Sequence, residues 1–275
     1  MPDYCETLVR KHDYDRYISA LFAPERVRAH FFALYAFNYE IAKIAETAET
    51  VHNPVAGQLR LQWWRDAVDE IYSGTRGRTE VLQALLSAVA AHRLPKPLFD
   101  AMLDAREQDF ESAPFADMTA LETYADATSA MLMRLAARML GAGDALDEQA
   151  RDAGIAYAVC GLLRAVPFQA ARGRIIVPVQ EMQKVGVDAP EMLRGHVSES
   201  ISRLIARLAE VAWRHYSSVH NVRRRFLPAI LPACLAPRFL QLMTRPGFNP
   251  FRDSTEISAH RRQWTMLLAM ASGRI

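Results

Sequence analysis

The chain has 275 residues, of which 51% are hydrophobic and 23% charged, a composition typical of a globular protein with a sizeable core. A formal net charge of +2 favours no particular class of partner, and no nucleic-acid partner is expected. Three widely spaced cysteines (Cys5, Cys160 and Cys234) exclude a disulfide framework and fit a reducing cytoplasm. The N-terminal segment lacks the apolar core of a signal peptide, and no apolar run approaches the roughly 20 residues that span a bilayer. A cytoplasmic protein, soluble or peripheral on a membrane, is therefore expected.

Helical patterns bounded by proline and glycine follow one another along nearly the whole chain. Pro24 favours a first helix from residue 25 to about 47, and Pro54 favours a second that ends at Ser73 and Gly74. The next expected helices cover residues 79–92, 98–110, 119–140, 146–166, 198 to about 225, 238–243 and 256–270. Pro167 is expected to end the helix over 146–166. Only residues 174–177 resemble a strand, and no linker or repeat divides the chain. We therefore expect one all-α domain over residues 1–275.

The expected helix over 146–166 has one face made of small side chains. At steps of three and four along it stand Gly154, Ala158, Gly161 and Ala165. Residues at this spacing stack on one side of a helix. The neighbouring Arg164, Arg172 and Arg174 suit an anion, whereas a magnesium site would need carboxylates where the small residues stand. This face is expected either to pack closely or to line a mostly apolar cavity.

Acidic residues cluster in the helix expected over 98–110. Asp100 and Asp104 are four residues apart and Asp109 follows, so one helix could present several carboxylates to a metal ion. Because Arg106 lies among them, a solvated charged face is the simpler interpretation. A magnesium site there is kept only as an alternative.

Two groups of basic residues carry weaker signals. His215 and His220 are five residues apart, a spacing that a helix splays, so they are interpreted as surface residues. The run Arg223–Arg224–Arg225 precedes an apolar, proline-broken stretch and is interpreted as a solvated helix end. Its alternative role is peripheral contact with an anionic membrane surface.

Taken together, these segments resemble the squalene/phytoene synthase family from residue 15 to about 253. The resemblance rests on the order and spacing of Leu34–Tyr35–Ala36–Phe37, Leu61–Gln62–Trp63–Trp64–Arg65, Tyr72, Gly74, Tyr124, Gly154–x–Ala156, Leu163–Arg164, Gly173–Arg174, Pro178, Ala212 and Tyr216. It implies an isoprenoid-synthase-type helical bundle around a central cavity.

Catalytic members of that family carry two aspartate-rich motifs on facing helices. The resemblance implies that their carboxylates bind magnesium ions, which bridge to the diphosphates of two prenyl substrates and neutralise the leaving group. In this chain the first motif falls on residues 42–46, where Ala42 stands and Glu46 is the remaining acid. The second falls on Gly161, Ala165 and Gln169, where the family has Asn, Asp and Asp. No catalytic residue and no cofactor are therefore predicted, and magnesium would be required only by a prenyltransferase.

One branch of the family fits the chain better than its enzymes do. Residues 36–42, the segment RLQWWRDAVDEIY and the Arg164–Ala165–x–Pro167 substitution resemble the non-catalytic complex I assembly factor branch and its bacterial relatives. That resemblance implies a role in the biogenesis of NADH–quinone oxidoreductase on the cytoplasmic or matrix face of the inner membrane. The implied partners are subunits of that complex or its assembly proteins.

Two hypotheses follow from these patterns. The first is a pseudoenzyme whose fold binds a protein partner or an apolar, prenyl-like ligand. The second is a prenyltransferase acting on farnesyl or geranylgeranyl diphosphate. Candidate ligand-pocket residues are Tyr35, Asn38, Glu46, Arg164 and Arg174. In the purely structural alternative, the two arginines pair with Glu46 and Asp152.

Overall fold

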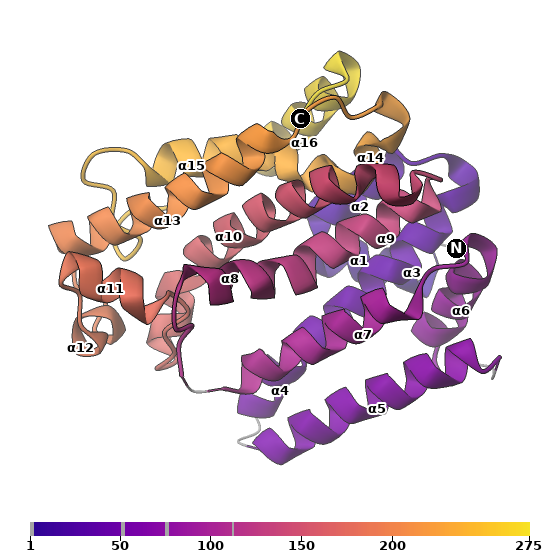
Figure 1. Ribbon diagram of the computed structural model, residues 1–275, viewed down its shortest axis with the longest axis horizontal. Helices are drawn as coiled ribbons and strands as arrows, with labels where there is room; N and C mark the ends of the chain where they lie inside the picture. Colours follow the sequence, from indigo (N-terminus) through magenta and orange to yellow (C-terminus); the bar gives the residue numbers. More distant parts are fainter. Residues whose placement is uncertain (1–2, 51–52, 75–76, 112) are drawn as a thin grey trace.

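The computed structural model describes residues 3–50, 53–74, 77–111 and 113–275, and every regular element within these ranges is a helix (Figure 1). The prediction of an all-α fold is confirmed. The first half contains α1 (Tyr4–His12), α2 (Tyr14–Leu21), α3 (Glu25–Ala42), α4 (Ile44–Thr50), α5 (Pro54–Tyr72), α6 (Glu80–His92), α7 (Lys96–Ala105), η1 (Arg106–Phe110), α8 (Met118–Ala125), the π-helical η2 (Asp126–Ala130) and α9 (Met131–Met139). The second half contains η3 (Gly143–Leu146), α10 (Asp147–Ala171), α11 (Val179–Val185), α12 (Ala189–Leu193), α13 (Glu199–Ser218), η4 (Arg224–Phe226), α14 (Leu227–Ile230), η5 (Leu231–Leu235), α15 (Ala236–Met243) and α16 (Ala259–Ser272).

The long helix α10 lies in the middle of the bundle and belongs to both halves of the core. Its first turns place Ala150 and Ala153 in an apolar cluster with α3, α5 and α6. Its later turns place Val159 and Leu163 in a second cluster with α13 and α15. In Figure 1, α13 to α16 run along one edge of the molecule and α5 runs along the opposite edge. Helix α10 thus connects the two parts of the core.

Pro167 does not end the sixth predicted helix, because α10 continues to Ala171. Proline removes one backbone donor, a loss that tertiary contacts can offset near a helix end. Here Val166 and Ala170 on either side are buried, so continuing the helix keeps both in the core. The helix ends at Ala171, two residues before Gly173, whose φ of +74° is a left-handed conformation that glycine adopts without steric cost.

Other boundaries also differ from the sequence prediction. The helix predicted over 25–47 is interrupted at Lys43, which separates α3 from α4. The helix predicted to reach about residue 225 ends at Ser218. The strand-like residues 174–177 form no strand within the described part of the chain. Helices α1 and α2 were not predicted; Asp13 separates them, and its side chain accepts a hydrogen bond from Arg16 N at the start of α2.

Two helical stretches are long and apolar enough to cross a membrane when only length and composition are considered. They are Gly143–Ala171 and Arg224–Met243, and within the most apolar 18-residue window of each, 50% and 78% of the residues are buried in the protein. Arg164 and Arg238 interrupt these stretches, so the expectation that no uninterrupted apolar run spans a bilayer is not contradicted. Their burial is what a core helix of a folded domain shows.

Candidate functional site

The two segments aligned with the family motifs meet at one cavity of about 210 Å³. Ala42 and Glu46 reach it from the junction of α3 and α4, and Ala165 and Gln169 reach it from the end of α10. Arg174, which follows α10, completes this group. Residues more than 100 positions apart in the chain are thus brought together as the resemblance implied.

Charged side chains line the cavity, which is therefore not the mostly apolar space considered from sequence. Its charged residues are Glu46, Glu49, Arg106, Asp109, Glu111, Arg172 and Arg174. The volume is also below the range of about 300–1,000 Å³ that is usual for small-molecule sites. A long hydrocarbon chain therefore does not match the size and lining of this cavity.

The arginines of the cavity are already held by neighbouring oxygens. Arg172 Nη2 lies 2.7 Å from Glu46 Oε1, in a pair whose side chains are 45% and 56% exposed. Arg174 Nη2 donates to the backbone oxygen of Asp109 at 2.7 Å. Arg164 instead places its guanidinium 4.2 Å from the centre of the Phe239 ring. The predicted pairing of Arg164 and Arg174 with Glu46 and Asp152 is therefore wrong.

A second set of hydrogen-bonded side chains at the cavity joins η1 to α8. Arg106 Nη1 donates to Tyr124 OH at 2.9 Å and to Asp109 Oδ2 at 3.2 Å, and the tyrosine hydroxyl donates to Asp109 Oδ1 at 2.7 Å. Burial, followed by the nearby Asp109 carboxylate, raises the pKa of Tyr124, so this hydroxyl keeps its proton. Arg106 Nε and Gln169 Oε1 are buried without a partner among the described residues. Sequence reasoning missed Arg106 as a cavity residue because its role depends on how η1 faces α10.

The other sequence candidates lie away from this cavity. Gly161 and Arg164 line a separate open groove of about 580 Å³ between α10 and residues 250–256. Tyr35 is fully buried in α3 and Asn38 is nearly so. The cavity lining that the described residues form contains none of these four.

Aromatic and cationic side chains occupy the space between α3 and α10. The guanidinium of Arg16 lies 6.0 Å from the ring centre of Tyr35 and 5.2 Å from that of Tyr157. Arg16 Nη1 also pairs with Asp13 Oδ2 at 2.6 Å. An arginine within about 6 Å of two aromatic ring centres gains cation–π attraction from each of them. Part of the interior between the two motif-bearing helices is thus filled.

The acidic residues considered from sequence as an alternative magnesium site are each held by a different basic side chain. Asp100 is bound by Lys96 at 2.7 Å, Asp104 by Arg65 at 3.1 Å, and Asp109 by Arg106. Among the described residues, no three His, Cys, Asp or Glu side chains are grouped as a metal site would require. The prediction that this chain holds no metal remains a prediction.

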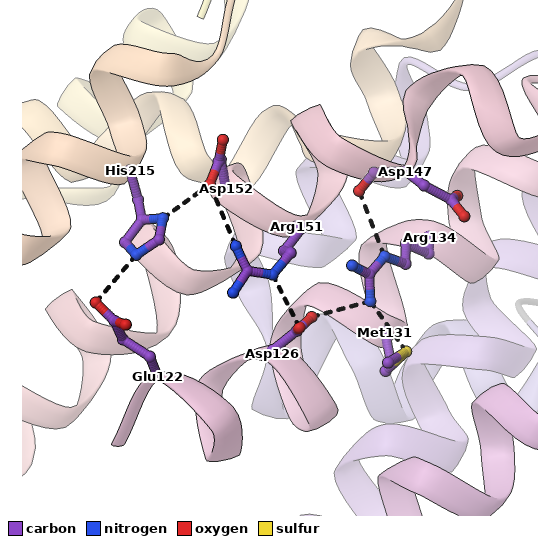
Figure 2. A network of polar contacts seen from close by, with 8 residues as sticks. All are labelled: Glu122, Asp126, Met131, Arg134, Asp147, Arg151, Asp152 and His215. Carbon is purple, nitrogen blue, oxygen red and sulfur yellow. Dashed lines mark hydrogen bonds and ion pairs between the residues drawn. The ribbon is translucent and has the colours of Figure 1, made fainter. Parts of the chain in front are cut away.

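His215 is not a surface residue but part of a network of polar contacts that holds α10 to its neighbours (Figure 2). Its Nδ1 lies 2.8 Å from Asp152 Oδ1 and its Nε2 lies 3.3 Å from Glu122 Oε1, with 12% of the side chain exposed. Arg151 and Arg134 both bind Asp126, on η2, at 3.0 and 2.9 Å. The network therefore joins α8, η2, α9, α10 and α13 at the end of α10 opposite the cavity.

The squalene/phytoene synthase profile matches residues 9–266 of the chain. The chain belongs to the squalene/phytoene synthase family. Among solved structures, a dehydrosqualene synthase bound to a ligand has a TM-score of 0.82 at 18% identity, covering 98% of this chain and 95% of that one. A squalene synthase from Alicyclobacillus acidocaldarius has a TM-score of 0.69 at 19% identity, covering 98% and 92%. At such identities the structures establish the isoprenoid-synthase-type fold alone.

The family contains curated relatives of two kinds. The "NADH dehydrogenase (ubiquinone) complex I, assembly factor 6" of Bos taurus is 30% identical over 258 residues, covering 92% of this chain and 77% of the relative. The "Presqualene diphosphate synthase" of Sinorhizobium fredii is 24% identical over 254 residues, covering 88% of each. The resemblance inferred from sequence, both to the family and to its assembly-factor branch, is confirmed.

Proposed function

We propose that this chain acts in the biogenesis of respiratory complex I and uses its squalene/phytoene synthase fold for binding rather than for prenyl transfer. The higher identity to the bovine assembly factor than to the bacterial synthase supports this choice. The proposed partners are subunits of NADH–quinone oxidoreductase or its assembly proteins. The proposed location is the cytoplasm, at the inner face of the membrane that holds the complex.

One structural observation carries the non-catalytic part of the proposal. Where the two motif segments meet, Ala42 and Ala165 present methyl groups, and the remaining carboxylate of Glu46 is held by Arg172. Magnesium ions need several oxygen ligands, and ionisation of a diphosphate needs its developing charge to be neutralised. The motif positions supply one carboxylate of that ligand set, and it is already paired with an arginine.

The filled interior supports the same conclusion. Two prenyl chains would need a long apolar space, whereas Arg16 lies near the rings of Tyr35 and Tyr157, and the cavity at the motif segments is small and lined by charged residues. An apolar or prenyl-like ligand would require these side chains to move. We therefore place the protein partner ahead of the apolar ligand.

Prenyl transfer is the competing function, because the presqualene diphosphate synthase relatives share the fold and three arginines remain at the cavity. It is tested by incubating the purified chain with magnesium and farnesyl or geranylgeranyl diphosphate. We expect neither C30 or C40 products nor release of diphosphate. Turnover that Glu46→Ala abolishes would overturn the non-catalytic proposal.

The assembly role is tested by deleting the gene and measuring NADH–quinone oxidoreductase activity and C30 and C40 isoprenoids in the same cells. We expect complex I activity to fall while the isoprenoids stay unchanged. Reintroducing the wild-type gene or the Glu46→Gln variant is expected to restore the activity equally. Loss of isoprenoids with normal complex I activity would contradict the proposal.

A further inference from the structure

Helix α16 exposes a stripe of large apolar side chains. Trp264 is 61% exposed, Leu267 44% and Leu268 59%. With the exposed His260, Arg261 and Ala271, they form one continuous side of the helix, called here the α16 face. Three of the chain's large exposed apolar residues thus fall within five positions of one helix, an arrangement that marks an interaction surface.

The exposure of this face is fixed by contacts on the other side of the helix. Arg262 Nη1 pairs with the buried Asp15 Oδ1 at 2.7 Å, and Gln263 hydrogen-bonds the hydroxyl of Tyr14. Met266 and Ala269 are buried in the core. A rotation that hid Trp264 would break the ion pair of Asp15, so the apolar side chains are held toward solvent.

Charge is distributed unevenly along the chain, which the overall value of +2 conceals. Residues 211–275 contain ten arginines and two acids, Asp253 and Glu256, a formal charge of +8. Residues 1–210 contain 23 basic and 29 acidic residues, a formal charge of −6. One of the two acids, Asp253, pairs with Arg252 at 2.8 Å. The part of the protein that carries α16 is therefore strongly basic.

Arginines lie beside the middle of α16 and near its C-terminal end. Arg238 of α15 donates from Nε to Thr265 Oγ1 at 2.7 Å, so it lies beside the middle of α16. At the far end, Arg274 shares a pocket with residues 219–222, and the exposed Arg223–Arg225 run follows directly. In Figure 1, α14, α15 and α16 lie together along the edge of the molecule opposite α5. The basic run considered from sequence as a membrane contact thus belongs to the same edge as the α16 face.

We propose that the α16 face docks the protein on an anionic phospholipid surface. A helix whose outer side combines tryptophan and leucine with arginines, and lacks carboxylates, suits the boundary between headgroups and acyl chains. Anionic headgroups attract nearby arginines, and this attraction weakens as salt is added. The inference goes beyond the assembly role and does not depend on it.

The test is flotation of the full chain with phosphatidylcholine vesicles that contain or lack phosphatidylglycerol, at low and high salt. We expect binding only to the anionic vesicles, reduced by salt. Trp264→Ser with Leu268→Ser is expected to weaken binding about tenfold or more, because the buried apolar side chains are removed. The matched control is Val55→Ser with Leu59→Ser on α5, a pair with the same spacing and with exposures of 61% and 66%. This control is expected to bind as the wild type does.

Two further measurements separate lipid binding from other causes. The triple substitution Arg223→Gln, Arg224→Gln and Arg225→Gln is expected to weaken binding to anionic vesicles at low salt. Vesicles are expected to shift the fluorescence of the wild type to shorter wavelength but not that of Trp264→Phe. Equal binding to neutral vesicles, no binding at low salt, or binding unchanged by Trp264→Ser with Leu268→Ser would overturn the proposal. So would a wild-type oligomer that the same pair of substitutions converts to monomers while vesicle binding is absent, because a second copy would then cover the face.

Discussion

Gly154 and Gly161 lie on the same small-residue face of α10, but their surroundings differ. At Gly154, a Cβ atom would lie 2.3 Å from the Cα of Ala130, so the absence of a side chain lets α10 and η2 approach closely. At Gly161, a Cβ would meet no described atom within 4 Å. The same residue type at regular spacing therefore marks a tight helix contact at one end and an open groove at the other.

The charged contacts near the two ends differ in the same way. Around the packed end, Asp126 is held by both Arg134 and Arg151 and links η2 to its neighbours (Figure 2). At the C-terminal end of α10, beyond Gly161, Glu46 and Arg172 form one pair that is about half exposed. Exposed pairs contribute little to stability, whereas enclosed networks fix the geometry of the elements they join. The C-terminal end of α10 is therefore held by a weaker charged contact than the end at Asp126.

The largest expected effect is on the reactivity of the Cys160 thiol, which lies between the two glycines in the sequence. Burial raises the pKa of its thiol to about 12, as it does for Cys5 and Cys234. Because only the thiolate reacts, native thiols at pH 8 should react with Ellman's reagent about 10³-fold more slowly than a free cysteine. Since the folded state holds these protons more tightly than the unfolded state, the free energy of unfolding should fall as pH rises above about 8.5. A rapidly reacting thiol in the native protein would contradict this assignment.

Gly154→Ala is expected to lower the free energy of unfolding by about 2–3 kcal/mol, because the added methyl must displace the backbone of η2. Urea denaturation followed by circular dichroism measures the change. A change below about 0.5 kcal/mol, the usual range for a neutral surface substitution, would show that the contact with Ala130 is not tight.

Gly161→Ala is the matched substitution at the open end and is expected to act in the opposite direction. Alanine has a higher helix propensity than glycine, and the added Cβ meets free space among the described residues. The free energy of unfolding should therefore rise by about 0.5–1 kcal/mol. Destabilisation of similar size to that of Gly154→Ala would remove the distinction between the two ends.

The smallest effect is expected for Glu46→Gln, which breaks the pair with Arg172. Because both side chains are about half exposed, solvent screens the interaction and the loss should be within about 0.5 kcal/mol. A much larger loss of stability, measured under the same urea conditions, would mean that Glu46 has a structural role the exposed geometry does not account for.

The amino-acid sequence alone determined the helical architecture. The prolines and glycines that bound α5 and the repeating apolar residues act through local geometry, so they are readable without tertiary contacts. The placement of Ala42 and Glu46 opposite Ala165 and Gln169 followed from the family resemblance. Both kinds of inference depend on order and spacing along the chain.

Tertiary structure alone decided which side chains meet. Helix α10 continues past Pro167 because Val166 and Ala170, on either side of the proline, are buried in the core. The tertiary structure pairs Glu46 with Arg172 rather than with Arg174, and it places the half-buried His215 between two carboxylates. Ion pairs between helices depend on rotations and separations that many packed residues set together, and no local pattern encodes these. For the same reason, the closed surroundings of Gly154 and the open surroundings of Gly161 became distinguishable only in the folded bundle.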